Sequence, residues 1–267
     1  MPIHTIKYKS ANIRYKTDGQ GKAVVLLHGY LESLEIWDSF ATELSKTHLV
    51  ISMDLHGHGE SETIQNEASV EIMAEGVKAV LDYLKIEKVV MIGHSMGGYA
   101  VLAFAELWPG LLLGFGLFHS ISWGDLPEKK IARDREIELI KEGKKQLIVN
   151  VNIPRGFADD NLEKFKTEVD RAIAIASKTT DDGVIAALNA LKSRPDRTHI
   201  LEKAEVPVYF AVGMKDNYIP VEKLLNLSKL PKNKQITVFE NSGHMAFIEE
   251  QAYALDEIEV FLRTCFS

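Results

Sequence analysis

Six short, almost continuous apolar runs recur along this chain and constrain its fold more than any other feature. Strands buried on both faces have this character, because both rows of their side chains face a core. Helical patterns separate several of the runs, and such alternation is typical of a mostly parallel sheet with helices on both faces. The runs are residues 23–27 (AVVLL), 49–53 (LVISM), 89–92 (VVMI), 111–118 (LLLGFGLF), 206–212 (VPVYFAV) and 235–239 (QITVF).

Two further patterns complete the sheet-forming part of the chain. Apolar and polar residues alternate at positions 3–9 and 12–17, which predicts a two-stranded hairpin. Apolar residues at helical spacing fall between the buried runs. They predict helices over about residues 33–45, 69–84 and 96–107.

The regular alternation is interrupted by a charged stretch that repeats apolar residues at helical spacing. Within it, residues 146–153 (QLIVNVNI) fit either a strand or a helix. Neither end of the stretch has the composition of a linker. We therefore predict an α/β core formed by residues 1–122 and 197–267, with residues 123–196 inserted as a helical cap.

Composition restricts the classes of function. The chain has 267 residues, 46% of them apolar, and a net charge of −7 from 31 basic and 38 acidic residues. Proteins that bind nucleic acid usually carry the opposite sign, so we expect no such partner. The single cysteine, Cys265, cannot form an internal disulfide. The chain starts without the apolar segment of a signal peptide, and its apolar runs are too short to span a membrane, so we expect a cytoplasmic protein without membrane contacts.

A serine between glycines stands where a buried run meets a helical pattern. The segment GHSMG, residues 93–97, follows the run VVMI and precedes a predicted helix. In a nucleophile elbow, G-x-S-x-G, a sharp turn presents the serine at the end of the sheet and requires small residues two positions away. We therefore predict Ser95 as a nucleophile and the backbone N–H of Met96 as an oxyanion donor. The alternative is a serine that only caps the helix.

A second oxyanion donor is expected in the loop after the first central strand. There the sequence reads His28-Gly29-Tyr30, and the glycine permits close approach of the backbone to a ligand. We predict the backbone N–H of Tyr30 as this donor, with Leu31 as the less favoured alternative. His28 is expected to order the loop and not to act as a base.

A serine of ordinary pKa needs a positioned base, and the base needs an acid that holds its tautomer. Among nine histidines, His244 follows the last strand run and precedes the final helical pattern, which places it at the same sheet edge as Ser95. Asp216 follows the penultimate strand run, in a loop bounded by glycine and proline. In the order serine, acid, histidine, we predict Ser95, Asp216 and His244 as a catalytic triad, with Asp125 as the rival acid.

No metal site is predicted. His56 and His58 are two residues apart and could share an ion, but a zinc site needs at least three ligands and no third histidine or cysteine stands nearby. An ordered loop beside the site is the favoured interpretation. We expect the chemistry to need neither a metal nor an organic cofactor.

Five segments, which occur in the expected order, make the chain resemble the α/β-hydrolase superfamily. It looks most similar to the capped, cofactor-free branch of esterases, lactonases and C–C-bond hydrolases. One departure is His56, where many relatives carry arginine, and we expect it to affect only loop packing. The segments begin at the first residue named: HGY (His28), DLHGHGES (Asp54), GHSMGG (Gly93), GMKDNYIP (Gly213) and NSGHMAFIEE (Asn241).

The resemblance implies an eight-stranded, mostly parallel sheet with a helical lid over Ser95. It also separates activities, because haloalkane dehalogenases and epoxide hydrolases of this fold carry an aspartate at the elbow. The serine therefore favours hydrolysis of a small carboxylic ester through an acyl-enzyme. Lactone, thioester or C–C bond hydrolysis remains open with the same triad, as do cofactor-free perhydrolysis and a role as a small-molecule receptor.

The substrate pocket is expected to draw on the insertion. Its candidate walls are aromatic or imidazole side chains, although two of them, Trp37 and His119, fit a position in the core equally well. The candidate walls are Trp37, His119, Trp123, Phe157 and Phe165. The candidate anchors for a substrate carboxylate are Lys129, Lys130, Arg133 and Arg155. The sequence does not indicate an oligomeric state.

Overall fold

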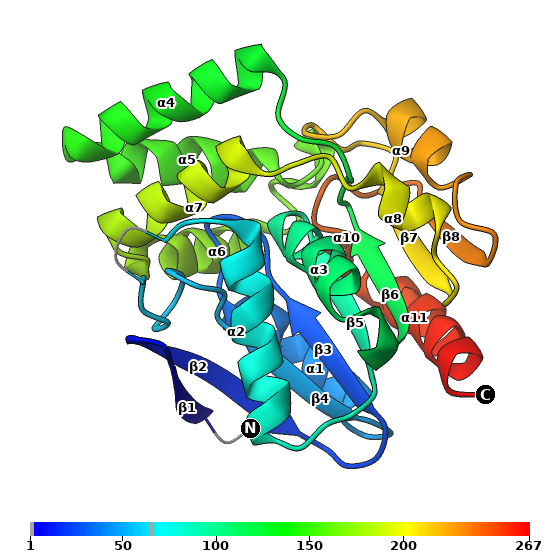
Figure 1. Ribbon diagram of the computed structural model, residues 1–267. Coiled ribbons are helices and arrows are strands. Elements are labelled where there is room, and N and C mark those ends of the chain that lie inside the picture. Colours follow the sequence, from blue (N-terminus) through cyan, green and yellow to red (C-terminus); the bar gives the residue numbers. More distant parts are fainter. Residues whose placement is uncertain (1–2, 65–66) are drawn as a thin grey trace.

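The apolar runs form the centre of one β-sheet (Figure 1). The strands are β1 (Ile3–Tyr8), β2 (Ala11–Asp18), β3 (Ala23–Leu27), β4 (Leu49–Met53), β5 (Val89–His94), β6 (Leu112–Phe118), β7 (Val208–Gly213) and β8 (Lys234–Phe239). In the computed structural model, which describes residues 3–64 and 67–267, these eight strands lie in the order β1-β2-β4-β3-β5-β6-β7-β8. The pairs β1–β2 and β2–β4 are antiparallel and the others are parallel. The predicted eight-stranded, mostly parallel sheet is confirmed.

Helices cover both faces of the sheet. These are α1 (Asp38–Leu44), α2 (Val70–Tyr83), α3 (Met96–Leu107), α9 (Val221–Leu227) and α11 (Gln251–Phe266). Successive side chains of a strand point to opposite faces. In β3, Val25 and Leu27 therefore belong to the apolar core to which α2, α3 and α9 contribute, whereas Val24 and Leu26 belong to the core of α1 and α11. All four side chains are completely buried, so the centre of the sheet lies between two apolar cores.

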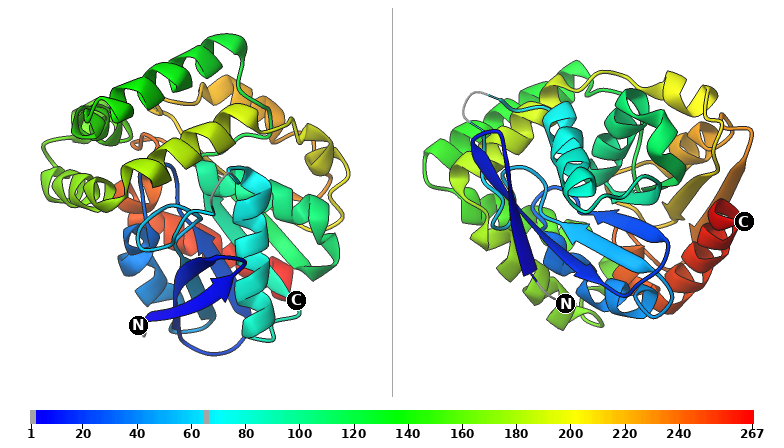
Figure 2. Two further views of the ribbon diagram at one scale, coloured as in Figure 1. Left: turned by 60° about the vertical axis from the view of Figure 1, so that its left-hand side comes forward. Right: turned by 60° about the horizontal axis from the view of Figure 1, so that its bottom comes forward.

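Four helices between β6 and β7 form a separate layer. They are α4 (Pro127–Lys141), α5 (Lys145–Arg155), α6 (Lys166–Lys178) and α7 (Asp181–Ser193). Figure 1 shows α4, α5 and α7 above the sheet, and the left view of Figure 2 shows the β1–β2 hairpin at the opposite end of the molecule. These helices fall inside the predicted insertion at residues 123–196, and the division into core and cap stays a prediction.

The segment that fitted either a strand or a helix is part of α5. Its residues Ile148, Val149 and Ile153 are buried, whereas Leu147 and Val151 are exposed. This spacing leaves one face of a helix in the core and does not fit the alternation of a strand. The helical interpretation of residues 146–153 is therefore the correct one.

Short helical segments complete the chain. They are η1 (Leu34–Trp37), η2 (Pro109–Leu111), η3 (Asp159–Asn161), α8 (Thr198–Glu202) and α10 (Ala246–Glu249). The helix predicted at residues 33–45 is divided into η1 and α1, while α2 and α3 match their predictions to within one residue at each end. In the part of the chain that the structure describes, no helix is both long and apolar enough to cross a membrane.

Candidate active site

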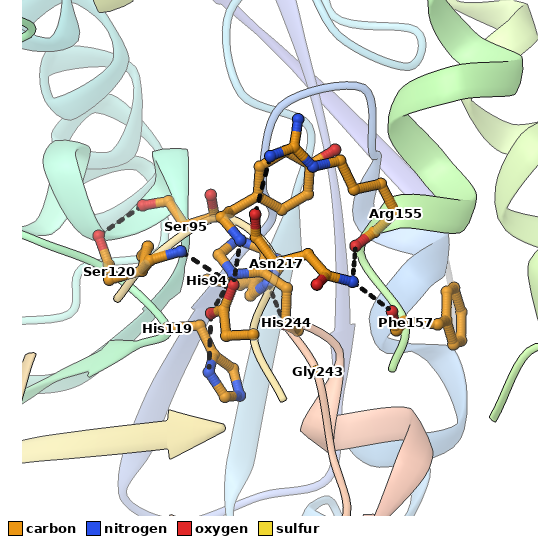
Figure 3. A network of polar contacts seen from close by, with 12 residues as sticks. His94, Ser95, His119, Ser120, Arg155, Phe157, Asn217, Gly243 and His244 are labelled. Carbon is orange, nitrogen blue, oxygen red and sulfur yellow. Dashed lines mark hydrogen bonds and ion pairs between the residues drawn. The ribbon is translucent and has the colours of Figure 1, made fainter. Parts of the chain in front are cut away.

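The serine predicted as nucleophile lies on a strained turn between β5 and α3. Ser95 has φ +49° and ψ −112°, a conformation that residues with a Cβ rarely adopt. The turn is held from the neighbouring strand: the Ser95 N–H donates to the Phe118 carbonyl (3.0 Å), and the Ser120 hydroxyl donates to the Ser95 carbonyl (2.6 Å; Figure 3). The end of β6 therefore fixes the position of the serine.

Close approach of backbone explains the glycines on either side. A Cβ on Gly93 would lie 2.3 Å from the carbonyl carbon of Gly97. A Cβ on Gly97 would lie 2.5 Å from the Leu27 carbonyl oxygen. Because these are backbone atoms in a packed interior, a larger residue at Gly93 would have to open the turn itself, and one at Gly97 would have to push the turn away from the end of β3. The geometry thus requires the small residues on which the elbow prediction rested.

His244 and Asp216, predicted as base and acid, are joined by a hydrogen bond. The His244 Nδ1 lies 2.7 Å from Asp216 Oδ2, and both side chains are buried. Asp216 Oδ1 accepts the backbone N–H groups of Tyr218 (2.7 Å) and Ile219 (3.0 Å), which fix the carboxylate in its loop. A carboxylate placed in this way keeps the proton on Nδ1 and leaves Nε2 as the proton acceptor.

The two groups offset the cost of burying each other's charge. Burial by itself raises the pKa of the Asp216 carboxyl, but the charge and hydrogen bond of His244 lower that pKa to about 2. Burial likewise lowers the pKa of His244, but the Asp216 charge and hydrogen bond raise it above the ordinary value. Asp216 therefore stays ionised, and His244 is a stronger base than a free imidazole.

Ser95 and His244 lie in the wall of one cavity of about 300 Å³. Tyr30 and Met96, whose N–H groups are predicted to bind an oxyanion, line the same cavity. Met96 begins α3, so its N–H has no acceptor within the helix. Among the described side chains, the Ser95 hydroxyl makes no hydrogen bond to His244. The structure thus brings the predicted nucleophile, the predicted base and both predicted donor residues to one space, with Asp216 behind His244.

Two polar residues that the sequence patterns did not single out connect the loops around this cavity. Glu32 Oε2 accepts the Gly29 N–H (2.5 Å) and lies 2.9 Å from His94 Nδ1. The other ring nitrogen of His94 donates to the His244 carbonyl (2.9 Å). The loop after β3, the elbow and the His244 loop are therefore held by one buried chain of contacts. His94 adjoins Ser95 in sequence, but its ring is committed to this structural role.

Comparison with known proteins agrees with this geometry. A family model described as the alpha/beta hydrolase fold matches residues 22–125. A thermophilic esterase from Thermogutta terrifontis, solved with malate bound, is 26% identical, with 100% of both chains covered and a TM-score of 0.95. The chain has the α/β-hydrolase fold.

Other relatives of this hydrolase carry different activities in their names. A 2-hydroxy-6-oxononadienedioate/2-hydroxy-6-oxononatrienedioate hydrolase from Pseudomonas putida is 28% identical over 252 residues, covering 88% of this chain and 86% of its own length. The enol-lactonase from Burkholderia xenovorans LB400 is 20% identical, covers 97% of this chain and 100% of its own, and has a TM-score of 0.90. At that identity the second similarity concerns the fold alone.

Four predicted pocket residues of the hydrolase lie outside the cavity wall, which corrects the prediction. One of them, Phe165, is partly buried against the apolar core that α1 and α11 share with the helical layer. Trp37, Phe157 and His119 are completely buried. Trp37 packs on the ring of Phe247, with centroids 4.4 Å apart, and Phe157 joins the apolar core that α1 and α11 share with the helical layer. Their loops reach the site, but their side chains point into the core, and spacing along the sequence cannot distinguish these directions. Trp123 does lie in the cavity wall.

His119 lies next to the His244–Asp216 pair, and Figure 3 shows both histidines. Its Nδ1 is 3.7 Å from Asp216 Oδ2, and its ring centroid is 5.6 Å from that of His244. Within the described residues, His119, Asp216 and His244 form the group whose ligand atoms, all within 4.8 Å of one another, are spaced closely enough to hold a metal. Asp216 and His244 already use those atoms in their hydrogen bond, so the arrangement suits a proton-holding pair.

The histidines that first suggested a metal order a loop instead. His56 Nε2 accepts the Ile64 N–H (2.6 Å), and His28 Nε2 accepts the Leu55 N–H (2.9 Å). Burial lowers the pKa of His56 to about 4 and that of His58 to about 3, so both rings are neutral. These contacts agree with the ordering roles expected for His28 and for the loop of His56.

Asp125, the rival acid, faces arginine side chains and not His244. Its Oδ2 lies 3.0 Å from Arg133 Nε, and its Oδ1 lies 2.8 Å from Arg194 Nη1. All three residues line the cavity. Arg194 was not among the predicted anchors, because it lies outside the charged helices and no sequence pattern relates it to Ser95.

Proposed function

We propose that this α/β hydrolase cleaves a small carboxylic ester through an acyl-enzyme, with Ser95, His244 and Asp216 as its triad. One observation carries the proposal. The imidazole of His244, with Nδ1 held by an ionised Asp216, opens onto the same cavity as a serine on a strained turn. A hydroxyl, a base and an oriented acid are the groups that acyl transfer needs.

In the first half of the reaction, His244 Nε2 takes the Ser95 proton as Oγ bonds to the ester carbonyl carbon. The N–H groups of Met96 and Tyr30 stabilise the oxyanion that forms. The intermediate then breaks its bond to the alcohol, and His244 returns the proton to the leaving oxygen. In the second half, His244 takes a proton from water as the water oxygen attacks the acyl carbon. The bond from this carbon to Ser95 Oγ then breaks, His244 returns the proton to Oγ, and the acid is released.

The helices α4–α7 would act as a cap that separates the cavity from bulk solvent during these steps. Contacts between the helical layer and the catalytic loops support this role. The His244 N–H donates to the Gly156 carbonyl at the end of α5 (2.7 Å), and Arg155 Nη2 donates to the Asn217 carbonyl beside Asp216 (2.9 Å; Figure 3). A displacement of α5 would therefore also displace the base.

Turnover of 4-nitrophenyl acetate and butyrate by wild type and by Ser95→Ala tests the proposal. The variant is expected to lose turnover while keeping its circular dichroism spectrum and melting temperature. Ser193→Ala, at the end of α7 and away from the cavity wall, should behave like wild type. Mass spectrometry of the wild-type protein after rapid acid quenching should find one added acyl group on Ser95. Equal turnover by wild type and Ser95→Ala would refute the scheme.

A second candidate is a lactone or a C–C bond, since relatives named for these substrates share the fold. A panel of esters, lactones, thioesters and vinylogous diketones, measured with wild type and Ser95→Ala, ranks these substrates by kcat/KM. The same panel separates an enzyme from a receptor that keeps the triad. A receptor would release about one equivalent of product per protein, whereas an enzyme continues to turn over.

A further inference from the structure

The cavity carries two arginines in its wall, although the chain as a whole has a net charge of −7. Arg133 and Arg194 are 9% and 5% exposed, and both contact the same carboxylate, that of Asp125. One carboxylate neutralises one of the two guanidinium groups. A buried charge without a partner is costly, so this arrangement favours a further anion in the cavity.

The two guanidinium groups also have hydrogen-bond donors to spare. Each guanidinium carries five N–H groups. Arg133 uses Nε for Asp125, and no side chain or carbonyl among the described residues accepts from its terminal nitrogens. Arg194 donates from Nη1 to the Leu191 carbonyl (2.7 Å), while its buried Nε has no acceptor. A planar acceptor such as a carboxylate matches such a pair of forked donors.

Aromatic rings of the cavity wall lie near the two guanidinium groups. The Arg194 Cζ lies 4.1 Å from the centre of the Tyr99 ring, and the Arg133 Cζ lies 6.0 Å from that of Tyr30. Tyr30 is also the predicted oxyanion donor, so Arg133 stands beside the place where the reacting carbonyl would bind. The Tyr30 hydroxyl donates to Glu136 Oε2 (3.3 Å). Among the described residues no ion pair joins Glu136 to Arg133 or Arg194, whose carboxylate partner is Asp125.

From this arrangement we propose that Arg133 and Arg194 form a carboxylate subsite, so that the substrate is an ester bearing a free carboxylate. The inference rests on the proposed function, because it places this carboxylate in the cavity that contains Ser95. It also selects among the anchors predicted from the sequence. Arg133 and Lys129 lie in the cavity wall, Lys130 and Arg155 do not, and Arg194 is added.

Matched pairs of esters test the subsite. On the acyl side, 4-nitrophenyl hydrogen glutarate is compared with its methyl-capped neutral analogue. On the alcohol side, 4-carboxyphenyl acetate is compared with 4-carbamoylphenyl acetate, and background hydrolysis is taken from Ser95→Ala. Hydrogen bonds to a charged group contribute about 1.5–3 kcal/mol, so the anionic ester of at least one pair should have a kcat/KM roughly 10-fold higher or more. The pair that shows the preference assigns the carboxylate to the acyl or the alcohol side.

In Arg133→Met this preference should fall to about one, whereas Lys130→Met, a neighbouring cation outside the cavity wall, should retain it. No preference in either pair, or an unchanged preference in both Arg133→Met and Arg194→Met, would overturn the subsite. If no ester is turned over, calorimetric titration with glutarate decides the matter. Binding that Arg133→Met abolishes would support the subsite while refuting the ester hydrolase, and absence of binding by wild type would refute the subsite.

A second inference concerns His119 and rests on a different observation. Its side chain is completely buried, and both ring nitrogens lack a hydrogen-bond partner among the described residues. Its backbone is strained, with φ +48°, at the end of β6. A Cβ on Gly213 would lie 2.9 Å from His119 Cε1, so the glycine leaves room for the ring. An unsatisfied, strained and buried histidine beside a catalytic pair calls for a physical explanation.

We infer that His119 is a positioning residue, which donates from Nδ1 to Asp216 Oδ2 when His244 moves toward the leaving group. Burial keeps the pKa of His119 well below its ordinary value, so the ring is neutral and carries one N–H. The present 3.7 Å separation from Oδ2 is too long for a hydrogen bond, and a small shift would close it. Further titratable groups around His244 and His119 are His94, Glu32, Glu249 and Tyr218, whose ring centroid lies 5.2 Å from that of His244.

The pH profile distinguishes positioning from mere packing. His119→Leu removes the donor, so the Asp216 charge acts more strongly on His244 in the substrate complex, and the acid limb of kcat should move to higher pH. His119→Asn tolerates a positive φ and offers an amide N–H near the Nδ1 position, so it should restore the wild-type limb. His58→Leu, which replaces another completely buried histidine with an unpartnered nitrogen, should leave the limb in place. An unmoved limb in folded His119→Leu, or no restoration by His119→Asn, would overturn the role.

Discussion

The floor and the roof of the cavity are built in different ways. At the floor, strand ends hold Ser95 through backbone contacts, and glycines allow the backbone of the turn to approach the neighbouring backbone closely. At the roof, Asp125, which precedes α4, forms ion pairs with Arg133 of α4 and with Arg194 after α7. Backbone contacts leave few residue types possible, whereas side-chain pairs can be exchanged one residue at a time. The floor of the cavity therefore determines the chemistry, and the roof can determine the substrate.

Two buried carboxylates give the sharpest test of this difference. Asp216→Asn should reduce kcat/KM for a neutral ester by about 10⁴-fold, because an amide no longer holds the His244 tautomer. Asp125→Asn, in the roof, should change it by roughly 10-fold or less, because its partners are arginines that take no part in proton transfer. Steady-state kinetics on 4-nitrophenyl butyrate measures both. A larger loss in Asp125→Asn would reverse the roles given to the two residues.

Two tryptophans extend the test to stability. Trp37→Ala should lower the free energy of unfolding by about 3–5 kcal/mol, because it empties a large site in the core beneath the elbow. Trp123→Ala, in the cavity wall, should cost less stability and raise KM for the ester. Urea denaturation measures the first effect and steady-state kinetics the second. Equal destabilisation by the two substitutions would show that the roof of the cavity is packed as tightly as its floor.

Two glycines isolate the backbone contribution. Gly97→Ala should destabilise the protein by about 1–3 kcal/mol and lower kcat, because its Cβ would press against the end of β3. A Cβ on Gly110 meets nothing within 4 Å, so Gly110→Ala should stay within about 1 kcal/mol of wild type. Thermal unfolding and turnover of one ester suffice for the comparison. Wild-type activity in Gly97→Ala would show that the elbow can relax.

The smallest expected effect is a shift in pH dependence. His244 must be neutral to accept the serine proton, and Asp216 raises its pKa above the ordinary value of 6.5. The kcat/KM for a neutral ester should therefore fall as pH decreases through a midpoint above 6.5. Wild-type profiles, corrected with Ser95→Ala, give this midpoint. A midpoint below 6.5 would mean that burial outweighs the Asp216 charge.

Much of the fold followed from local patterns. The apolar runs predicted the central strands, and helical spacing predicted α2 and α3 to within one residue at each end. Residues 146–153 were ambiguous, because a short apolar segment fits both periods until its packing partners are known. In the site, chain order and loop position indicated Asp216 and His244, which the structure joins by a hydrogen bond.

The directions of side chains were decided by tertiary structure alone. Trp37, Phe157 and His119 are near the site in the chain path, but their side chains face the core. The pairing of Asp125 with Arg194 joins two ends of the helical insertion, and no local period records such a contact. The sequence by itself determined the sheet, the elbow and the order of the predicted triad, because these depend on local backbone preference and on the period of apolar residues. The shape and charge of the cavity depend on contacts between distant segments, which form only when the chain is packed.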